Sequence, residues 1–83
     1  MKFKAEIDIM PLKALLDPQG KAVTSSMQNI GLSEIENVRI GKHISLEISA
    51  SNESEAKEKI NSACEKLLAN KIMESYSFTI EEI

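Results

Sequence analysis

Hydrophobic and polar residues alternate strictly near both ends of the chain, over Lys2–Ile9 and again over Glu74–Glu82. A period of two is typical of a strand that is buried on one face only, as in an antiparallel sheet with one solvated side. The residues predicted to face the core are Phe3, Ala5, Ile7 and Ile9 in the first strand and Tyr76, Phe78 and Ile80 in the last.

The stretch Asn37–Ala50 alternates as well, with its apolar residues at even positions. A hairpin with the three-residue loop Gly41-Lys42-His43 would pair Ile40 with Ile44 and keep the apolar face continuous, whereas a two-residue loop would break the pattern. A single long bent strand would preserve the same parity, so the pattern leaves both arrangements open. We predict the hairpin.

Two segments have the period of a helix. Asp17 is a natural N-cap, Pro18 suits the first helical position, and Gly31 supplies a stop. The second helix begins at Asn52, which has capping-box spacing to Glu55. The apolar stripes are Ala22, Val23, Met27 and Ile30 in the first helix and Ala56, Ile60, Ala63, Cys64 and Leu67 in the second.

The predicted order of elements is β-α-β-β-α-β, which is the ferredoxin-like arrangement. We therefore expect an α+β fold in which residues 1–83 form one domain, with an antiparallel sheet and two helices covering one of its faces. No repeat or low-complexity segment interrupts the pattern. This arrangement hosts many unrelated activities, so the fold does not give the function.

Composition excludes several classes of function. The net charge of −3 offers no electrostatic footprint for nucleic acid or an anionic membrane. One cysteine fits a reducing compartment, no apolar run is long enough to span a membrane, and the charged start MKFKAEID is not typical of a signal peptide. These features predict a soluble, cytoplasmic protein.

The residues that could carry chemistry are few. One histidine and one cysteine do not supply the four ligands of a structural zinc site. His43 is predicted to be a solvated turn residue, and Cys64 to be a buried, inert thiol on an apolar stripe. The aromatic residues fall on the core-facing register, which leaves none exposed to stack on RNA bases. The acidic residues of the second helix, which fall on its solvent face, are Glu53, Glu55, Glu58 and Glu65.

Arg39 is the only arginine, and the alternation places it on the non-core face beside Gly41 and Lys42. Its planar guanidinium suits a carboxylate or phosphate, so these three residues are candidates for contact with an anion or a partner, although a lone exposed cation is commonly just solvated.

The turn Asp17-Pro18-Gln19-Gly20 is the second candidate. A helix N-terminus can bind phosphate, but the carboxylate of Asp17 at the cap would repel an anion. Glycine in a first turn costs up to about 1 kcal/mol relative to alanine, and the close approach of another backbone would account for Gly20.

The stretches LLDPQGKAV (Leu15–Val23), NVRIGKHISLEI (Asn37–Ile48) and CEKLLANKIMESYSF (Cys64–Phe78) resemble the PurS family, the small subunit of phosphoribosylformylglycinamidine (FGAM) synthase in purine biosynthesis. The resemblance implies a subunit without a catalytic, cofactor or metal site of its own. It also implies partners: a PurL-type synthetase that uses ATP and magnesium, a PurQ-type glutaminase, and a second copy of this chain in a homodimer or higher oligomer. The subunit would join the two partners and aid ammonia transfer.

Two alternatives come from other classes of protein. A ferredoxin-like domain can serve as a small-molecule sensor between paired sheets. An acylphosphatase-like hydrolase would need an anion-binding arginine in the loop after the first strand, but the connection Met10–Leu16 holds only Lys13. The hydrolase alternative is therefore weak.

Overall fold

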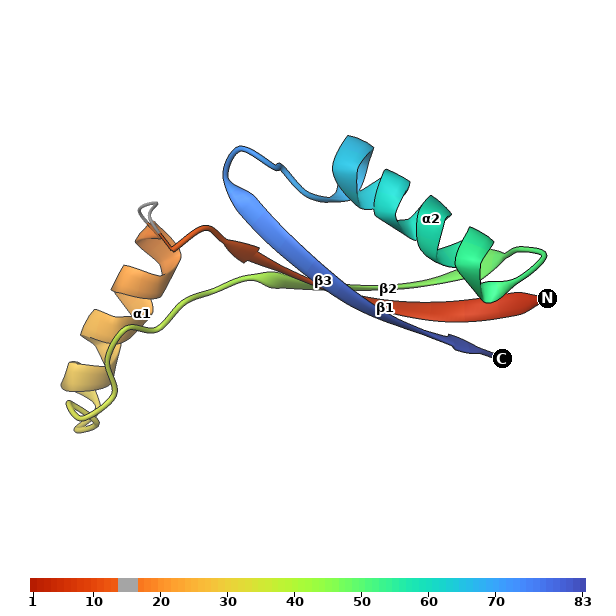
Figure 1. The fold of residues 1–83 in the computed structure, drawn as a ribbon. Helices are drawn as coiled ribbons and strands as arrows, with labels where there is room; N and C mark the ends of the chain where they lie inside the picture. Colours follow the sequence, from red (N-terminus) through yellow and green to blue (C-terminus); the bar gives the residue numbers. More distant parts are fainter. Residues whose placement is uncertain (14–16) are drawn as a thin grey trace.

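The computed structural model describes residues 1–13 and 17–83, so part of the predicted connection Met10–Leu16 lies outside the described residues. The elements follow one another from the N-terminus to the C-terminus in the order shown by the colours of Figure 1. They are β1 (Lys2–Pro11), α1 (Pro18–Asn29), β2 (Lys42–Ser49), α2 (Glu53–Ala63), the π-helical turn η1 (Cys64–Leu68) and β3 (Glu74–Glu82).

The strands form one antiparallel sheet in the order β2-β1-β3. In the central strand, Phe3 lies opposite Ile48 of β2 and Glu82 of β3, and both ladders continue without a break in register. Side chains therefore alternate between an apolar face and a polar face along all three strands. The α+β class and the antiparallel sheet are confirmed, and the order β-α-β-α-β is ferredoxin-like with one strand fewer than predicted.

The predicted hairpin is wrong, because the described residues contain three strands rather than four. Gly41-Lys42-His43 is not a loop: β2 begins at Lys42, and residues 37–41 precede it outside the sheet. The N–H of Val38 donates to Thr24 Oγ1 and that of Ile40 donates to Asp17 Oδ2. These donors thus bind side chains of α1 and its cap instead of a neighbouring strand.

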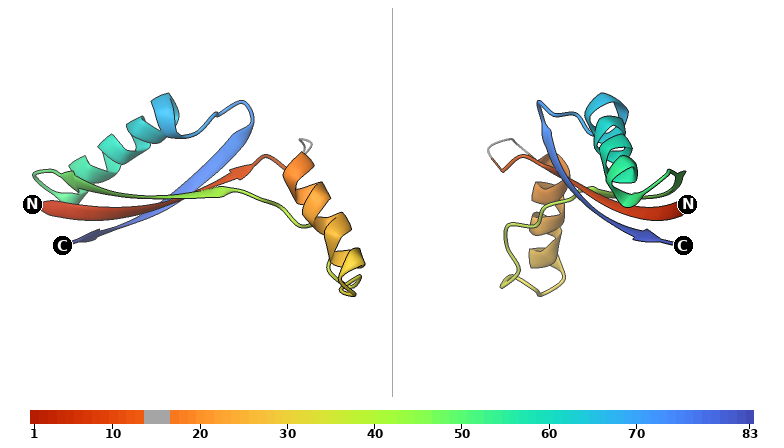
Figure 2. Two further views of the ribbon diagram at one scale, coloured as in Figure 1. Left: turned by 180° about the vertical axis from the view of Figure 1, so that it is seen from behind. Right: turned by 45° about the vertical axis from the view of Figure 1, so that its right-hand side comes forward.

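The main core lies between α2 and the apolar face of the sheet (Figure 2). Ile7, Ile9, Ile60 and Cys64 are its largest fully buried side chains. Asn52 caps α2 as predicted, since its Oδ1 accepts from the N–H of Glu55 at 2.8 Å. The Glu55 carboxylate in turn accepts a hydrogen bond from the N–H of Ser51, the residue before the cap. Half-buried residues from the strands and the π-helical turn complete this core: Ile44, Leu46, Ile48, Leu68, Tyr76, Phe78 and Ile80.

One member of the predicted α2 stripe is wrong: Leu67 is 82% exposed, whereas Leu68 packs against the core. The π-helical turn explains the shift. A π-turn has one more residue per hydrogen-bonded loop than an α-turn, so residues after Cys64 are rotated relative to the α-helical period. The bond from the N–H of Ala69 to the C=O of Cys64, at 3.0 Å, closes this wider turn.

The prediction that both helices cover the sheet is also wrong for α1, which projects away from the sheet (Figures 1 and 2). The molecule measures 51 × 27 × 14 Å and its radius of gyration is 16.5 Å, against about 12 Å for a compact chain of this length. The apolar stripe of α1 is too sparse to compete for the sheet: Val23 and Met27 are half-buried, and Ala22 and Ile30 are exposed. Neither helix of the described ranges is long and apolar enough to cross a membrane.

The end of α1 follows the prediction. Gly31 has a φ of 83°, which a glycine adopts without steric cost. The N–H of Gly31 donates to Gln28 O and that of Leu32 donates to Met27 O, the two bonds of a Schellman motif. These bonds turn the chain back along α1 toward β2.

Candidate functional site

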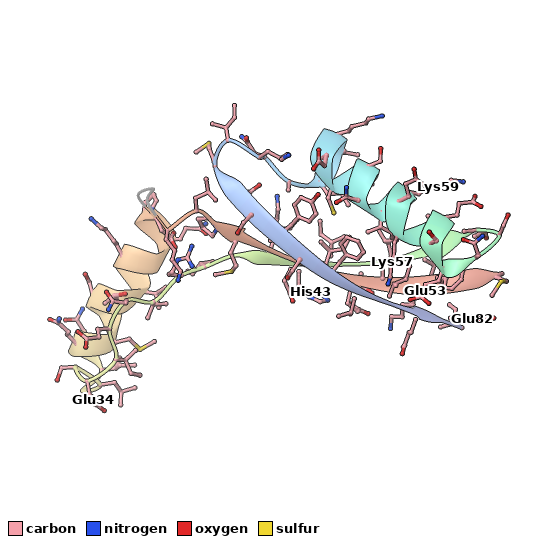
Figure 3. The ribbon with its side chains drawn as sticks, in the orientation of Figure 1. Glu34, His43, Glu53, Lys57, Lys59 and Glu82 are labelled. Atoms are coloured by element: carbon pink, nitrogen blue, oxygen red, sulfur yellow. The ribbon has the colours of Figure 1, made fainter. Side chains whose placement is uncertain are left out.

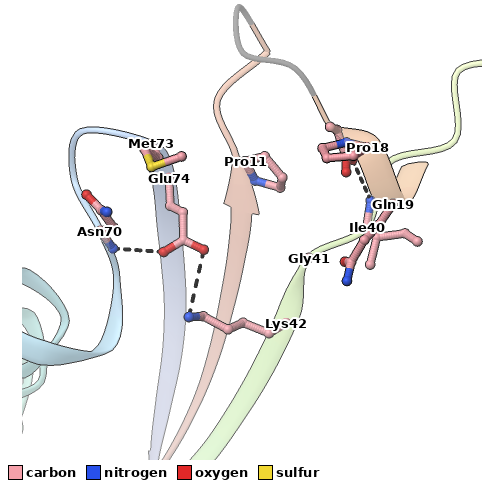
Figure 4. Close-up of a pocket in the computed structure, with 10 residues that line it drawn as sticks. Pro11, Pro18, Gln19, Ile40, Gly41, Lys42, Asn70, Met73 and Glu74 are labelled. Carbon is pink, nitrogen blue, oxygen red and sulfur yellow. Dashed lines mark hydrogen bonds and ion pairs between the residues drawn. The ribbon is translucent and has the colours of Figure 1, made fainter. Parts of the chain in front are cut away.

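A hollow of about 550 Å³ lies where the end of the sheet meets the start of α1 (Figure 4), and we refer to it as the tip hollow. It brings together five of the seven residues that the sequence nominated, from two segments far apart in the chain. They are Asp17, Pro18, Gln19, Gly41 and Lys42, and the rest of the lining is Pro11, Ile40, Asn70, Met73 and Glu74.

The carboxylate of Asp17 joins α1 to the segment that leads into β2. Its Oδ1 accepts from the N–H of Gly20 and its Oδ2 accepts from the N–H of Ile40, each at 3.0 Å. These two bonds, that of Gly20 first, hold the pKa of Asp17 below its usual range. Asp17 is therefore both the predicted N-cap and a brace between distant parts of the chain.

The predicted close approach of another backbone to Gly20 is confirmed, and that backbone belongs to the same chain. A Cβ at Gly20 would overlap the carbonyl oxygen of Val38 and the carboxylate of Asp17. Thr24 reinforces the contact, because its hydroxyl donates to Gly20 O at 2.8 Å and accepts from the N–H of Val38 at 3.0 Å. Glycine stands in this first turn because the segment 38–40 packs directly on it.

Arg39 and Gly41 make a second connection, between that segment and β1. Arg39 is half-buried rather than on the outer face of a strand, and its Nη2 donates to the carbonyl oxygen of Pro11. A Cβ at Gly41 would overlap Ile9 O and Met10 Sδ. Arg39 and Gly20 do not line the tip hollow, and their contacts set the angle between α1 and the sheet.

The exposed part of the tip hollow carries Pro18 and Gln19 on one side and Lys42 on the other. Lys42 Nζ lies 3.7 Å from Glu74 Oε2, and Glu74 Oε1 accepts from the N–H of Asn70 at 2.8 Å (Figure 4). This surface offers an amide, an ion pair and apolar patches side by side.

Sequence reasoning did not select Asn70, Met73 and Glu74 as site residues. The feature that could have identified them is the pairing of the two terminal strands. Glu74 lies opposite Pro11, which brings the start of β3 to the end of β1. This pairing brings the three residues to the end of β1, and the contacts of the segment 38–41 then place α1 beside them.

His43 is not the solvated turn residue that the sequence predicted. It lies on the polar face of β2, opposite Asp8, and Figure 3 shows it below the sheet. Its Nδ1 is 2.7 Å from Asp8 Oδ1 and its Nε2 is 2.5 Å from Glu6 Oε2. The hydrogen bond to Asp8, then that to Glu6, raises the pKa of His43, and the bond from His43 lowers the pKa of Glu6.

Cys64 is fully buried in the core, as predicted. Burial raises the pKa of its thiol, so the reactive thiolate is disfavoured. Within residues 1–13 and 17–83, no group of three histidine, cysteine or acidic side chains is placed to hold a metal ion.

Comparisons with known proteins agree over nearly the whole chain. The family described as "PurS: Phosphoribosylformylglycinamidine (FGAM) synthase" matches residues 4–82. The PurS subunit of phosphoribosylformylglycinamidine synthase from Synechocystis sp. is 42% identical over 67 residues, 81% of this chain and 67% of that protein. The Bacillus subtilis subunit is 35% identical over 81 residues, 98% of this chain and 95% of its own length.

A chain in the solved structure of PurLQS from Thermotoga maritima superposes with a TM-score of 0.89 at 31% identity. The superposition covers 98% of this chain and 99% of that one. These findings favour a synthase subunit over the small-molecule sensor that the sequence left open. The chain belongs to the PurS family, the small subunits of phosphoribosylformylglycinamidine synthase in purine biosynthesis.

Proposed function

We propose that this chain joins a PurL-type synthetase to a PurQ-type glutaminase and aids the transfer of ammonia between them. The observation that carries the proposal is the match over 98% of the chain to a chain of the Thermotoga maritima PurLQS structure. In the complex, glutamine hydrolysis on one partner supplies ammonia for the ATP-dependent conversion of FGAR to FGAM on the other. ATP and magnesium belong to the synthetase, and the complex works in the cytoplasm.

The shape of the molecule supports a bridging role. At 51 Å, its long axis is almost twice its second axis, because α1 extends beyond the sheet. A rod of this kind can touch two partners at separate ends without bringing their surfaces together. The sheet is at one end and α1 at the other (Figure 2).

The tip hollow is the surface that we assign to a partner. Its residues come from α1, from the start of β2 and from the start of β3, so a partner bound there would contact both halves of the molecule. Asp17, Gly20, Arg39 and Gly41 hold the two halves at a fixed angle. Pro18, Gln19 and Lys42 present the exposed side chains.

The test is co-purification of the tagged full-length chain with both partner subunits. Gln19→Arg places a bulky charge on the exposed rim of the tip hollow and should reduce recovery of one partner at least tenfold. The matched control is Gln28→Arg, an exposed glutamine at the far end of the same helix. Equal recovery with both variants would remove the tip hollow from the interface, and failure of the unchanged chain to recover either partner would contradict the bridging role.

A further inference from the structure

Glu74 presents a fixed carboxylate to the tip hollow (Figure 4). Its Oε1 accepts from the N–H of Asn70 at 2.8 Å, and its own N–H donates to Asn70 O at 2.6 Å. Glu74 also lies opposite Pro11 in the ladder between β1 and β3. The backbone and the side chain of Glu74 are therefore both held in place, and its second oxygen, Oε2, faces Lys42.

The counter-ion of this carboxylate is held much less firmly. Lys42 Nζ lies 3.7 Å from Glu74 Oε2, which is longer than a hydrogen bond of about 3 Å. The side chain of Lys42 is 52% exposed, against 24% for that of Glu74. Exposed ion pairs of lysine contribute little, because water screens the charges and a long flexible side chain has to be ordered. Glu74 is thus a partly buried, fixed anion whose cation can move into solvent.

Asp17, the other carboxylate of the tip hollow, already has its partners. Its two oxygens accept from the N–H groups of Gly20 and Ile40, and the positive charge of Arg39 also acts on it. The lining therefore holds two carboxylates beside the ammonium of Lys42. An acidic side chain of a partner would be repelled by both carboxylates, whereas a cationic side chain would be attracted to Glu74.

The rest of the lining suits the stem of a long side chain. Pro11, Pro18, Ile40 and Met73 contribute apolar surface to the tip hollow. Lysine and arginine bury their methylene groups along surfaces of this kind and keep the charged head at a polar group. The volume of about 550 Å³ lies within the range of about 300–1,000 Å³ that is typical of sites for small ligands, so the hollow has room for such a side chain.

We propose that the tip hollow receives a lysine or arginine side chain of a partner subunit, whose cationic head binds Glu74 in place of Lys42. This inference rests on the proposed assignment of the tip hollow to a partner, and it specifies the chemistry of the residue bound there. A charge-assisted hydrogen bond to Glu74 is stronger than the loose ion pair that it replaces. Because contacts of Asp17 and Gly41 fix the walls of the hollow before binding, little conformational freedom is lost when the side chain enters.

The experiment is co-purification of the tagged full-length chain with both partner subunits, using two variants that change the charge in opposite directions. Glu74→Gln keeps an oxygen to accept from the N–H of Asn70 but removes the charge. It should reduce recovery of one partner about tenfold, the scale of one hydrogen bond to a charged group. Lys42→Met keeps the apolar stem and removes the competing ammonium, so it should raise recovery of the same partner roughly twofold.

The matched control is Glu82→Gln, which changes an exposed glutamate at the opposite end of β3 (Figure 3) and should leave recovery unchanged. Lower recovery with Lys42→Met would show that the hollow binds an acidic side chain instead, and would overturn the proposal. Unchanged recovery with Glu74→Gln would also overturn it, while leaving the bridging role intact.

A second arm needs no partner subunit, so it separates this inference from the bridging role. The isotope-labelled chain is titrated with N-acetyl-arginine amide or N-acetyl-glutamate amide, and the NMR signal of the Asn70 N–H reports on the carboxylate of Glu74. The arginine probe should shift this signal in a saturable way, with an affinity about tenfold weaker in Glu74→Gln. A larger response to the glutamate probe, or no saturable response to the arginine probe, would overturn the proposal.

Discussion

At the scale of single residues, His43 makes a prediction about pH. Its pKa is raised because the ring lies between the carboxylates of Asp8 and Glu6, with Asp8 the larger cause. A raised pKa in the folded state gives stability that is complete below the unfolded value of about 6.5 and is lost as the pH rises through the folded value. We expect the free energy of unfolding to decline over that window and His43→Gln to abolish the decline.

The measurements are an NMR titration of the ring and urea unfolding at several pH values. Glu6 affects stability at acidic pH. Its lowered pKa gives stability that is lost as the pH falls through the folded-state pKa. A His43 pKa at or below about 6.5 would contradict the observed contacts. So would an unchanged pH dependence in His43→Gln.

Cys64 makes a prediction about the core. It is fully buried and shares the core with Ile60, so Cys64→Ala removes one buried sulfur atom and should cost about 1 kcal/mol of unfolding free energy. The reconstituted synthase should keep its turnover. Loss of turnover in a folded Cys64→Ala protein would show that the thiol has a role in catalysis.

At the scale of elements, the junction of α1 with the segment 38–40 can be tested at Gly20. Helix propensity alone predicts that Gly20→Ala gains up to about 1 kcal/mol. Because the new Cβ would overlap Val38 O, we expect instead a loss of about 1 kcal/mol or more. Ser25→Ala, at an exposed position of the same helix, is the control and should not destabilise the protein. A stabilised Gly20→Ala in thermal unfolding would contradict the junction.

The π-helical turn makes a prediction about two neighbouring leucines. Leu67 is 82% exposed and Leu68 packs against the core, the reverse of what an α-helical stripe predicts. Leu67→Ala should change the unfolding free energy by less than about 0.5 kcal/mol, whereas Leu68→Ala should cost about 1–2 kcal/mol. Urea denaturation of the two variants measures the difference. A larger loss for Leu67→Ala would restore the α-helical register.

The elements that the sequence predicted well are those specified by local signals. The terminal strands follow from alternation, and Asp17, Asn52 and Gly31 mark helix ends through their own side chains or backbone freedom. The failures share one cause. Alternation near Val38 reports an extended backbone and not its hydrogen-bond partner, which here is α1 rather than a strand. The π-turn likewise changes which side chains after Cys64 face the core, and the spacing of apolar residues does not reveal that change.

The candidate site shows the same division. The tip hollow brings together five of the residues predicted from the sequence. Asp17 and Gly41 both lie where two distant segments approach each other closely. A helix cap and a glycine are local sequence signals of such positions. Arg39 could not be placed, because its half-buried position depends on the carbonyl of Pro11, 28 residues away in sequence. Long-range partners of this kind become visible only when strand pairing is known.

At the scale of the whole molecule, the position of α1 is the feature that distinguishes this chain from a compact ferredoxin-like domain. A radius of gyration of 16.5 Å and a 51 Å long axis leave one face of the sheet and most of α1 without cover from the described residues. Surfaces of this kind are what a small subunit offers to larger partners. We therefore expect the function of this chain to depend on the geometry of its exposed surfaces, as the proposed bridging role requires.

The proposed coupling of a glutaminase to a synthetase by this chain can be measured in a reconstituted reaction. FGAM formation by the two partner subunits is measured with glutamine or with free ammonia as the nitrogen donor, each with and without this chain. We expect omission of the chain to abolish glutamine-dependent turnover and to leave most of the ammonia-dependent turnover, because dissolved ammonia needs no bridge between active sites. Undiminished glutamine-dependent turnover without the chain would show that it does not bridge the two active sites.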